Sequence, residues 1–160
     1  MLNVTIDDSK LMKQLEEMPL KIRASLYKTI YALTLKLQKH VVVDKLQGQV
    51  LQKRSGALQR SIQNQVIQND SGVTGRVFSS GDVKYAAIHE FGGRIPPHII
   101  EPKNGEALAF MLNGKMSFFK KVNHPGSDMP ERSFMRSSLK DMRQEIINGM
   151  EKAISEATKL

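Results

Sequence analysis

The first side chains that could take part in chemistry are imidazoles and carboxylates. The chain has four histidines, and His89 is followed directly by Glu90. With His98 and His124, these residues raise the alternative of a metal-dependent hydrolase. A zinc-binding His-Glu-x-x-His helix needs its second histidine four residues after the first, and this chain has Gly93 there. We therefore expect surface or hydrogen-bonded histidines, with no metal and no cofactor.

Nucleophilic and phosphate-binding motifs are also missing from the sequence. The chain contains no cysteine, which excludes disulfides and thiol chemistry. Gly-x-Ser-x-Gly, the motif of a serine nucleophile on a sharp turn, does not occur. Ser80-Gly81-Asp82 and Phe91-Gly92-Gly93 lack the Gly-Lys-Ser/Thr ending of a phosphate-binding loop. The sequence thus predicts a protein that is not an enzyme and has no catalytic residues.

The charge of the chain suggests an anionic partner without identifying it. The formal net charge is +8, and lysines and arginines are spread over every segment. A solvated basic surface explains this pattern, and so does non-specific contact with DNA. Aromatic and basic residues adjoin in Phe118-Phe119-Lys120-Lys121. This stretch supports the alternative function of a stand-alone nucleic-acid-binding module.

Hydrophobic periodicity predicts helices at both ends of the chain. Apolar residues recur at steps of three or four from Ile22 to Val41, as on one stripe of an amphipathic helix. A shorter helix is expected over 9–17, and Pro19 breaks or kinks the chain between the two. A last helix is expected from Asp128-Met129-Pro130-Glu131, with Ser133 as a competing start.

Alternating patterns predict two β-hairpins between these helices. Residues 61–68 and 72–79 flank a turn-forming string, and residues 108–112 and 116–122 flank Asn113-Gly114, the strongest short hairpin signal. A short helix is expected over 84–91. The expected fold class is α+β, with two long helices packed on an antiparallel sheet of about four strands.

The chain is expected to form a single domain over 1–160. Residues 45–56 are rich in glutamine, glycine and basic residues, which predicts a flexible loop. No apolar run reaches the roughly 18 residues of a membrane span, and the amino end does not resemble a secretory signal. We therefore expect a soluble protein, made in the cytoplasm, that has no membrane partner.

Four strings in order are similar to those of a known family. They are SGALQRSI at 55–62, YAAIHEFGG at 85–93, Ile95-Pro96-Pro97, and MPERSFM at 129–135. Together they resemble the virion morphogenesis, or tail-completion, family of long-tailed bacteriophages and prophages. The chain departs from the family's pattern at Ser55, where threonine is common, and at Ser133, where a proline usually precedes the aromatic residue.

The resemblance implies a structural protein without catalytic residues, made in the host bacterial cytoplasm and located in the virion. The protein is expected in a ring at the neck or the head-proximal tail end, where it takes part in tail completion or head–tail joining. Its implied partners are further copies of itself, with ring formation on assembly, and neighbouring neck, tail-terminator or tail-tube proteins. Non-specific contact with passing genomic DNA is also expected.

The sequence nominates two groups of residues for these contacts. The expected interface residues are aromatic or rigid, and aromatic side chains dominate well-packed interface cores: they are Tyr85, Phe91, Ile95, Pro96, Pro97 and Phe134. The expected docking-loop or DNA-lumen contacts are basic: they are Lys45, Lys53, Arg54 and Arg60.

Overall fold

The computed structural model describes residues 3–5, 20–69, 72–81, 83, 85–103 and 105–158. The helices are α2 (Leu20–Lys39), the π-helix η1 (His40–Gln49), α3 (Ala57–Ser61), α4 (Ala86–Phe91) and α5 (Met135–Thr158). The strands are β1 (Asn3–Thr5), β2 (Ile62–Asn69), β3 (Gly72–Ser79), β4 (Gly93–Ile95), β5 (His98–Ile100), β6 (Leu108–Leu112), β7 (Lys115–Phe119), β8 (Val122–His124) and β9 (Ser127–Met129). The helix expected over 9–17 and Pro19 lie outside the described residues.

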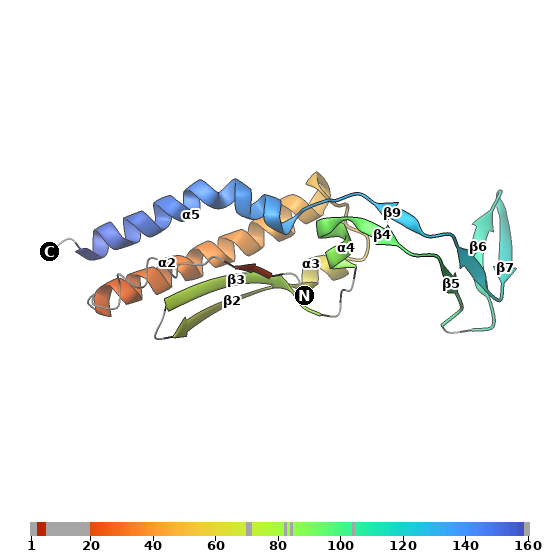
Figure 1. Ribbon diagram of the computed structural model, residues 1–160, viewed down its shortest axis with the longest axis horizontal. Coiled ribbons are helices and arrows are strands. Elements are labelled where there is room, and N and C mark those ends of the chain that lie inside the picture. Colours follow the sequence, from red (N-terminus) through yellow and green to blue (C-terminus); the bar gives the residue numbers. More distant parts are fainter. Residues whose placement is uncertain are drawn as a thin grey trace.

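The molecule consists of a helix–sheet body and a long projecting arm (Figure 1). In the body, α2 and α5 run antiparallel along each other, and α2 also covers the sheet formed by β1, β3 and β2. The arm is the segment from Gly93 to Met129, which leaves the body at one end as a β-ribbon. The α+β class predicted from the sequence is confirmed.

The long helices form because their apolar residues follow the helical period. Ile22, Leu26, Ile30, Leu33 and Leu37 are all buried along one stripe of α2, as the sequence predicts. The facing stripe of α5 buries residues spaced in the same way: Met135, Met142, Ile146 and Ala153. The two stripes meet in the core, which stabilises both helices by removing apolar surface from water.

Helical backbone continues beyond the predicted end of the long helix. η1 extends to Gln49 with a kink at Gln47 and Gly48, so Lys45 and Leu46, the first residues of the loop expected over 45–56, are helical. The carbonyl groups near the end of a helix lack partners within the helix and can accept from other donors. Gln59 Nε2 donates hydrogen bonds to the carbonyls of Val42 at 3.2 Å and Leu46 at 3.1 Å. A side chain far along the chain, which periodicity does not reveal, thus holds this helix end.

The first predicted hairpin is confirmed in position. β2 and β3 pair antiparallel from Ile62 opposite Ser79 to Asn69 opposite Gly72. Gly75 in β3 lies directly beneath α2, where an added Cβ would overlap Thr34 Oγ1 and lie 3.0 Å from Ile30 Cγ2. The missing side chain at this position therefore lets α2 approach the sheet closely.

We expect Gly75→Ala to lower the free energy of unfolding by about 1–3 kcal/mol, because the added methyl overpacks the interface between helix and sheet. Thr34 cannot rotate away without losing its 2.7 Å hydrogen bond to the Ile30 carbonyl. The measurement is equilibrium unfolding in urea. Gly81→Ala is the control, because a Cβ at Gly81 meets no atom within 4 Å. Equal destabilisation by both changes would contradict close packing at Gly75.

The second predicted hairpin forms, but not in the sheet. β6 and β7 pair at the tip of the arm, around Asn113 with φ 50° and Gly114 with φ 77°, as the Asn-Gly pair predicts. β4 pairs with β9 and β5 with β8, each as a separate two-stranded ribbon. The expectation that both hairpins share one sheet of about four strands is corrected accordingly. Alternation identifies strands and turns, but it does not show which hairpins lie side by side.

The last helix begins later than the first of its two predicted starts. Asp128 lies in β9, and α5 begins at Met135. Ser133 is the nearer start, because its hydroxyl accepts a 3.3 Å hydrogen bond from the Ser137 amide. Within the described part of the chain, no helix is both long and apolar enough to span a bilayer.

Candidate docking site at the base of the arm

The centre of the junction between body and arm is a buried carboxylate. Glu90 in α4 has no exposed surface, although acidic side chains are rarely buried without partners. Its carboxylate accepts hydrogen bonds from the amides of Phe134 at 2.8 Å, Met135 at 2.9 Å and Arg136 at 2.9 Å. The hydroxyl of Ser133 donates a fourth hydrogen bond, at 2.8 Å.

This arrangement explains why a charge is stable inside the protein. The first amides of a helix have no partners within the helix, and the helix dipole favours negative charge at that end. Glu90 takes the place of an N-cap residue for α5, although it comes from a helix 45 residues earlier in the chain than Met135. One side chain thereby links α4 to the first turn of α5.

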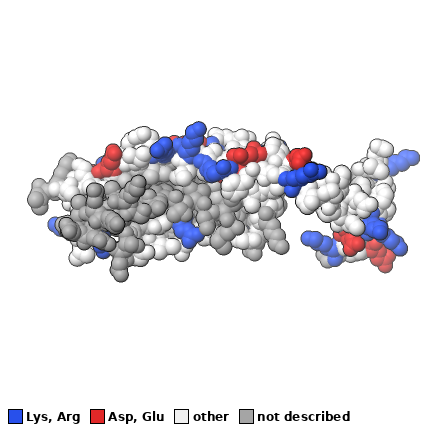
Figure 2. Space-filling view, in the orientation of Figure 1, with Lys and Arg blue, Asp and Glu red and all other residues white. Residues whose placement is uncertain are grey.

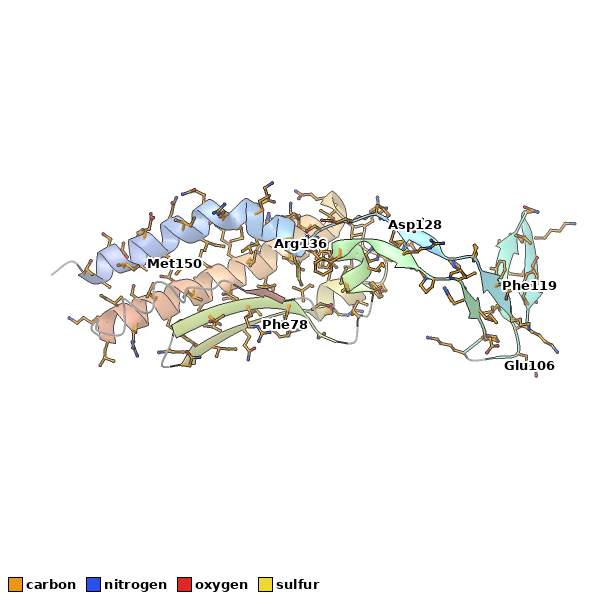
Figure 3. All side chains as sticks on the ribbon, in the orientation of Figure 1. Phe78, Glu106, Phe119, Asp128, Arg136 and Met150 are labelled. Atoms are coloured by element: carbon orange, nitrogen blue, oxygen red, sulfur yellow. The ribbon has the colours of Figure 1, made fainter. Side chains whose placement is uncertain are left out.

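Arg136 supplies the opposite charge and closes the junction from outside. Its Nε lies 3.2 Å from Glu90 Oε1, and its terminal nitrogen donates to the Glu90 carbonyl at 2.9 Å and to Glu131 Oε1 at 2.8 Å. The guanidinium carbon also lies 4.7 Å from the ring centre of Phe91, as in a cation–π contact. Figure 3 shows Arg136 where α5 meets the arm.

Close backbone contact holds the first strands of the arm. α4 ends at Phe91 and is followed by Gly92, whose φ of 67° and ψ of −168° are accessible essentially to glycine alone. A Cβ at Gly92 would lie 2.8 Å from the amide nitrogen of Glu131 and 2.9 Å from the carbonyl oxygen of Met129. The amide of Arg132 also donates to the His89 carbonyl at 2.8 Å. The incoming and outgoing chains therefore pass each other at backbone distance.

A basic pocket of about 770 Å³ opens beside this junction. Lys53, Arg54 and Arg132 contribute three cations to its lining, and no acidic side chain lines it among the residues that the structure describes. Tyr85 and His89 form part of the α4 side of the pocket. Electrostatics therefore favour an anionic occupant, a carboxylate or a phosphate.

His89 is a titratable group of the pocket whose surroundings shift its pKa. Burial, followed by the nearby positive charge of Arg132, lowers the pKa of His89 below its usual value. Its Nδ1 is buried and has no hydrogen-bond partner among the described residues. The ring packs edge-to-face against Tyr85 with a centroid distance of 5.8 Å. His89 is thus held in its neutral form.

We expect this histidine to destabilise the fold on acidification. Because its pKa is lower in the folded state, the unfolded chain binds the proton more readily, so stability falls as the pH drops below about 6.5. Between about pH 7 and pH 5, the urea concentration at the midpoint of unfolding should fall less for the His89→Gln variant than for the wild type. His98→Gln on the exposed arm is the control, and an identical pH profile for wild type and His89→Gln would contradict the assignment.

The structure does not gather the histidines and Glu90 into a metal site. Glu90 is engaged by α5, whereas His98 and His124 stack on each other in the arm with a centroid distance of 4.8 Å. No group of three or more potential ligands capable of holding a metal occurs among the residues that the structure describes. The stacked pair instead bridges β5 and β8, where these two residues are directly opposite.

The predicted interface residues lie in two environments. Tyr85 and Phe91 are exposed on α4, at 45% and 55% of their surface, so both are accessible to a partner. Pro96 and Pro97 are exposed on the arm, and Ile95 is half-buried. The prediction for Phe134 is wrong for this chain, because the side chain is fully buried in the core. Phe134 is buried instead of exposed at an interface because the first turn of α5 lies beneath α4.

The residues predicted as basic contacts also lie in different environments. Lys53 and Arg54 are exposed and line the pocket together. Arg60 is exposed and donates to the Ser55 carbonyl at 3.1 Å. Lys45 instead pairs with Asp141 at 2.6 Å, so it joins η1 to α5 within the chain. Hydrogen bonding by Lys45, with a further contribution from His40, lowers the pKa of Asp141.

Sequence reasoning overlooked the structural role of Glu90. It was considered only as part of a metal site beside His89, and its hydrogen-bond partners lie 43 to 46 residues away. The local signal for this role is a charged residue on the apolar side of a short helix, where Glu90 is buried together with Ala86. Comparisons of the chain with protein-family models, curated proteins and solved structures found no match.

Proposed function

We propose that this chain is a structural virion morphogenesis protein, located at the neck or the head-proximal end of a phage tail. It acts in tail completion or head–tail joining as part of a ring, and it catalyses no reaction. Its partners in this function are further copies of itself and the neighbouring neck, tail-terminator or tail-tube proteins.

The observation that supports this proposal best is the arm. Its tip displays large apolar side chains far from the body, and monomeric soluble proteins rarely expose extended apolar patches. The network around Glu90 and the close backbone contact at Gly92 hold the arm at its base. A body with a projecting arm whose tip exposes apolar side chains suits a protein that joins other subunits.

The test is electron microscopy of virions produced from the genome that encodes this chain, labelled with a gold-conjugated antibody against the native protein. We expect gold particles at the head–tail junction. The control is the same antibody on particles from a genome in which the reading frame is deleted. Absence of the chain from purified virions by mass spectrometry would contradict a structural role.

The basic pocket supports a second candidate function, a stand-alone nucleic-acid-binding module. Under this alternative the chain binds DNA in dilute solution, and the affinity falls steeply with salt because phosphate contacts release counterions. Fluorescence anisotropy of labelled DNA measures this, with Lys53→Glu/Arg54→Glu as the test variant. Lys152→Glu, at an exposed position paired with Glu156, is the control. Salt-independent or undetectable binding would remove this alternative.

A further inference from the structure

β2 forms an edge of the sheet that no other described strand covers. The strand order is β1–β3–β2, so β2 has β3 on one side and no strand of the described chain on the other. Figure 1 shows β2 at the outer margin of the sheet. The edge of a sheet presents amide and carbonyl groups that lack partners, and these groups are a template for pairing with another chain.

β2 lacks the features that normally protect such an edge. It is eight residues long, and its sequence, IQNQVIQN, contains no charged residue and no proline. Its register with β3 is continuous over the whole strand, so no bulge turns the edge away. On the face of the molecule drawn in Figure 2, most of the charged side chains lie along α5 and on the arm. The β2 edge is therefore open to pairing.

The hydrogen bonds of the ladder show which residues of β2 carry the outward groups. The Ser80 amide donates to the Ser61 carbonyl at 2.7 Å, directly before β2 begins. Because hydrogen-bonded and non-hydrogen-bonded pairs alternate along an antiparallel ladder, the even-numbered residues of β2 direct their amides and carbonyls away from β3. Gln38 Nε2 donates to the outward carbonyl of Ile62 at 2.8 Å, which agrees with this assignment. Within the described part of the chain, the outward groups that remain for another strand are those of Asn64, Val66 and Gln68.

The long helix exposes apolar side chains on the side of this edge. Leu35 lines a hollow of about 440 Å³ together with Ile62, so this side of α2 faces the β2 side of the sheet. Tyr27 and Tyr31 precede Leu35 at the helical spacing of four residues, and the three side chains form one stripe. They are exposed over 39%, 47% and 40% of their surface. We call these three side chains the α2 stripe.

The α2 stripe lies at the level of the middle of β2. Val66 is opposite Gly75 in the ladder, and a Cβ on Gly75 would meet Ile30 and Thr34 of α2. Tyr31 follows Ile30 directly, so it lies near the level of Val66 along the strand. The centre of the open edge and the centre of the apolar stripe therefore coincide.

From these observations we infer that two copies of the chain pair through β2, antiparallel and about a two-fold axis at Val66. This register places Val66 opposite Val66 of the second copy, and Asn64 opposite Gln68. All the remaining outward groups then form hydrogen-bonded pairs, whereas a shift along the strand leaves some of them unpaired. Because β2 carries no charge, no like charges lie opposite one another across the axis.

The position of the helices favours a second copy over a single strand of another protein. α2 lies over β3 and β2. Neighbouring strands are about 4.8 Å apart, so the axes of the two α2 helices in the pair lie about 10 Å apart. Packed helices have interaxial distances of about 8–10 Å. Tyr31 meets Tyr31 of the second copy, and Tyr27 meets Leu35. A second copy thus covers the strand edge and the α2 stripe together.

The contact uses the same surface on both copies. Such a contact closes at two copies and does not extend into a ring or a filament. It does not involve the arm. The inference goes beyond the proposed function and does not depend on it, so failure of either leaves the other in place.

Site-directed cross-linking tests the register, because the chain has no cysteine of its own. One preparation of the full chain carries Gln65→Cys and another carries Ile67→Cys, and the two are mixed under reducing conditions and then oxidised. In the inferred register these residues form a non-hydrogen-bonded pair with Cα atoms about 4.5 Å apart, within the range of a disulfide. We expect a disulfide-linked mixed dimer on non-reducing gels, and little linkage in either preparation alone.

Thr74→Cys replaces Ile67→Cys in the matched control. Thr74 is opposite Ile67 on β3, so it lies on the same face of the sheet but one strand further from the edge, and it should link poorly to Gln65→Cys. Efficient linkage of Gln65→Cys to itself would place the axis at Gln65 and overturn the register. No linkage above the level of the control, at the highest concentration at which the protein stays soluble, would overturn the contact and leave the β2 edge to another protein.

Sedimentation velocity tests the contact without cysteines. Tyr31→Glu should weaken self-association at least about tenfold, because the two carboxylates lose hydration and repel each other near the axis. Val66→Pro removes the outward amide at the axis and no hydrogen bond to β3, so it should weaken self-association as well. Both variants should keep the circular dichroism spectrum of the wild type, since Tyr31 is exposed and the Val66 amide lies outside the ladder with β3.

Phe118→Glu is the control for these variants. It adds the same charge at an apolar position, 69% exposed, on the arm tip, and it should dimerise as the wild type does. A wild type that stays monomeric up to its solubility limit would refute the inference. Weaker association of Phe118→Glu, with Tyr31→Glu unaffected, would mean that the arm tips carry the association instead.

Discussion

Glu90→Ala should lower the free energy of unfolding by about 3–5 kcal/mol, a large part of the stability of an ordinary domain. The change removes the acceptor for the amides of Phe134, Met135 and Arg136. The first two amides are buried, so water cannot replace the lost carboxylate at no cost. Urea unfolding followed by circular dichroism measures the effect, with the midpoint and the slope reported separately.

The matched control is the neighbouring carboxylate of Glu131. Its side chain is 55% exposed and, among the described residues, pairs with the Arg136 guanidinium alone, so Glu131→Gln should cost less than about 1 kcal/mol. The loss of unfolding free energy for Glu90→Gln should lie between these two values. The glutamine side chain keeps one oxygen acceptor, but it directs its NH₂ donors toward the backbone amides of the helix. If Glu90→Ala cost no more than Glu131→Gln, Glu90 would not be the centre of the junction.

Gly92→Ala should destabilise the chain by about 2–4 kcal/mol and alter the position of the arm. Two effects combine at this residue. The backbone has a conformation that alanine rarely adopts, and the new Cβ would meet backbone atoms of Glu131 and Met129 at 2.9 Å or less. Backbone atoms cannot turn away as a flexible side chain can, so β4 and β9 must separate. Urea unfolding measures the stability, and small-angle X-ray scattering measures the maximum dimension of the molecule.

Gly105→Ala separates the two effects. Gly105 also has a positive φ, 118°, but an added Cβ there meets no atom within 4 Å. The Gly105→Ala variant should therefore lose only the stability that depends on backbone conformation, about 1 kcal/mol. Its scattering profile should match that of the wild type. If both variants behaved alike, close contact at the arm base would not be what holds the arm.

Local patterns in the sequence predicted the individual elements well. The helical period from Ile22 to Val41 led to α2, and Asn113-Gly114 led to the turn between β6 and β7. These signals are reliable because they depend on residues a few positions apart, whose spacing directly reflects backbone geometry. The predicted end of the long helix was less accurate, since η1 depends on hydrogen bonds from Gln59.

The candidate site was predicted only in part. The structure places Phe91 against Arg136 at the start of α5 and brings Lys53 and Arg54 together at a pocket, while their predicted contacts with a partner or DNA stay predictions. The sequence did not reveal that Phe134 is buried in the core. Its environment depends on α4, which approaches from more than forty residues away.

By itself, the sequence determined the α+β class and the two hairpins. Only the tertiary structure decided that Glu90 caps α5, that the second hairpin stands apart from the sheet, and that Met111, Met116 and Phe118 at the arm tip are exposed. The reason is physical. Periodicity specifies which side chains share a face, whereas burial and hydrogen bonding depend on which distant segments pack against that face.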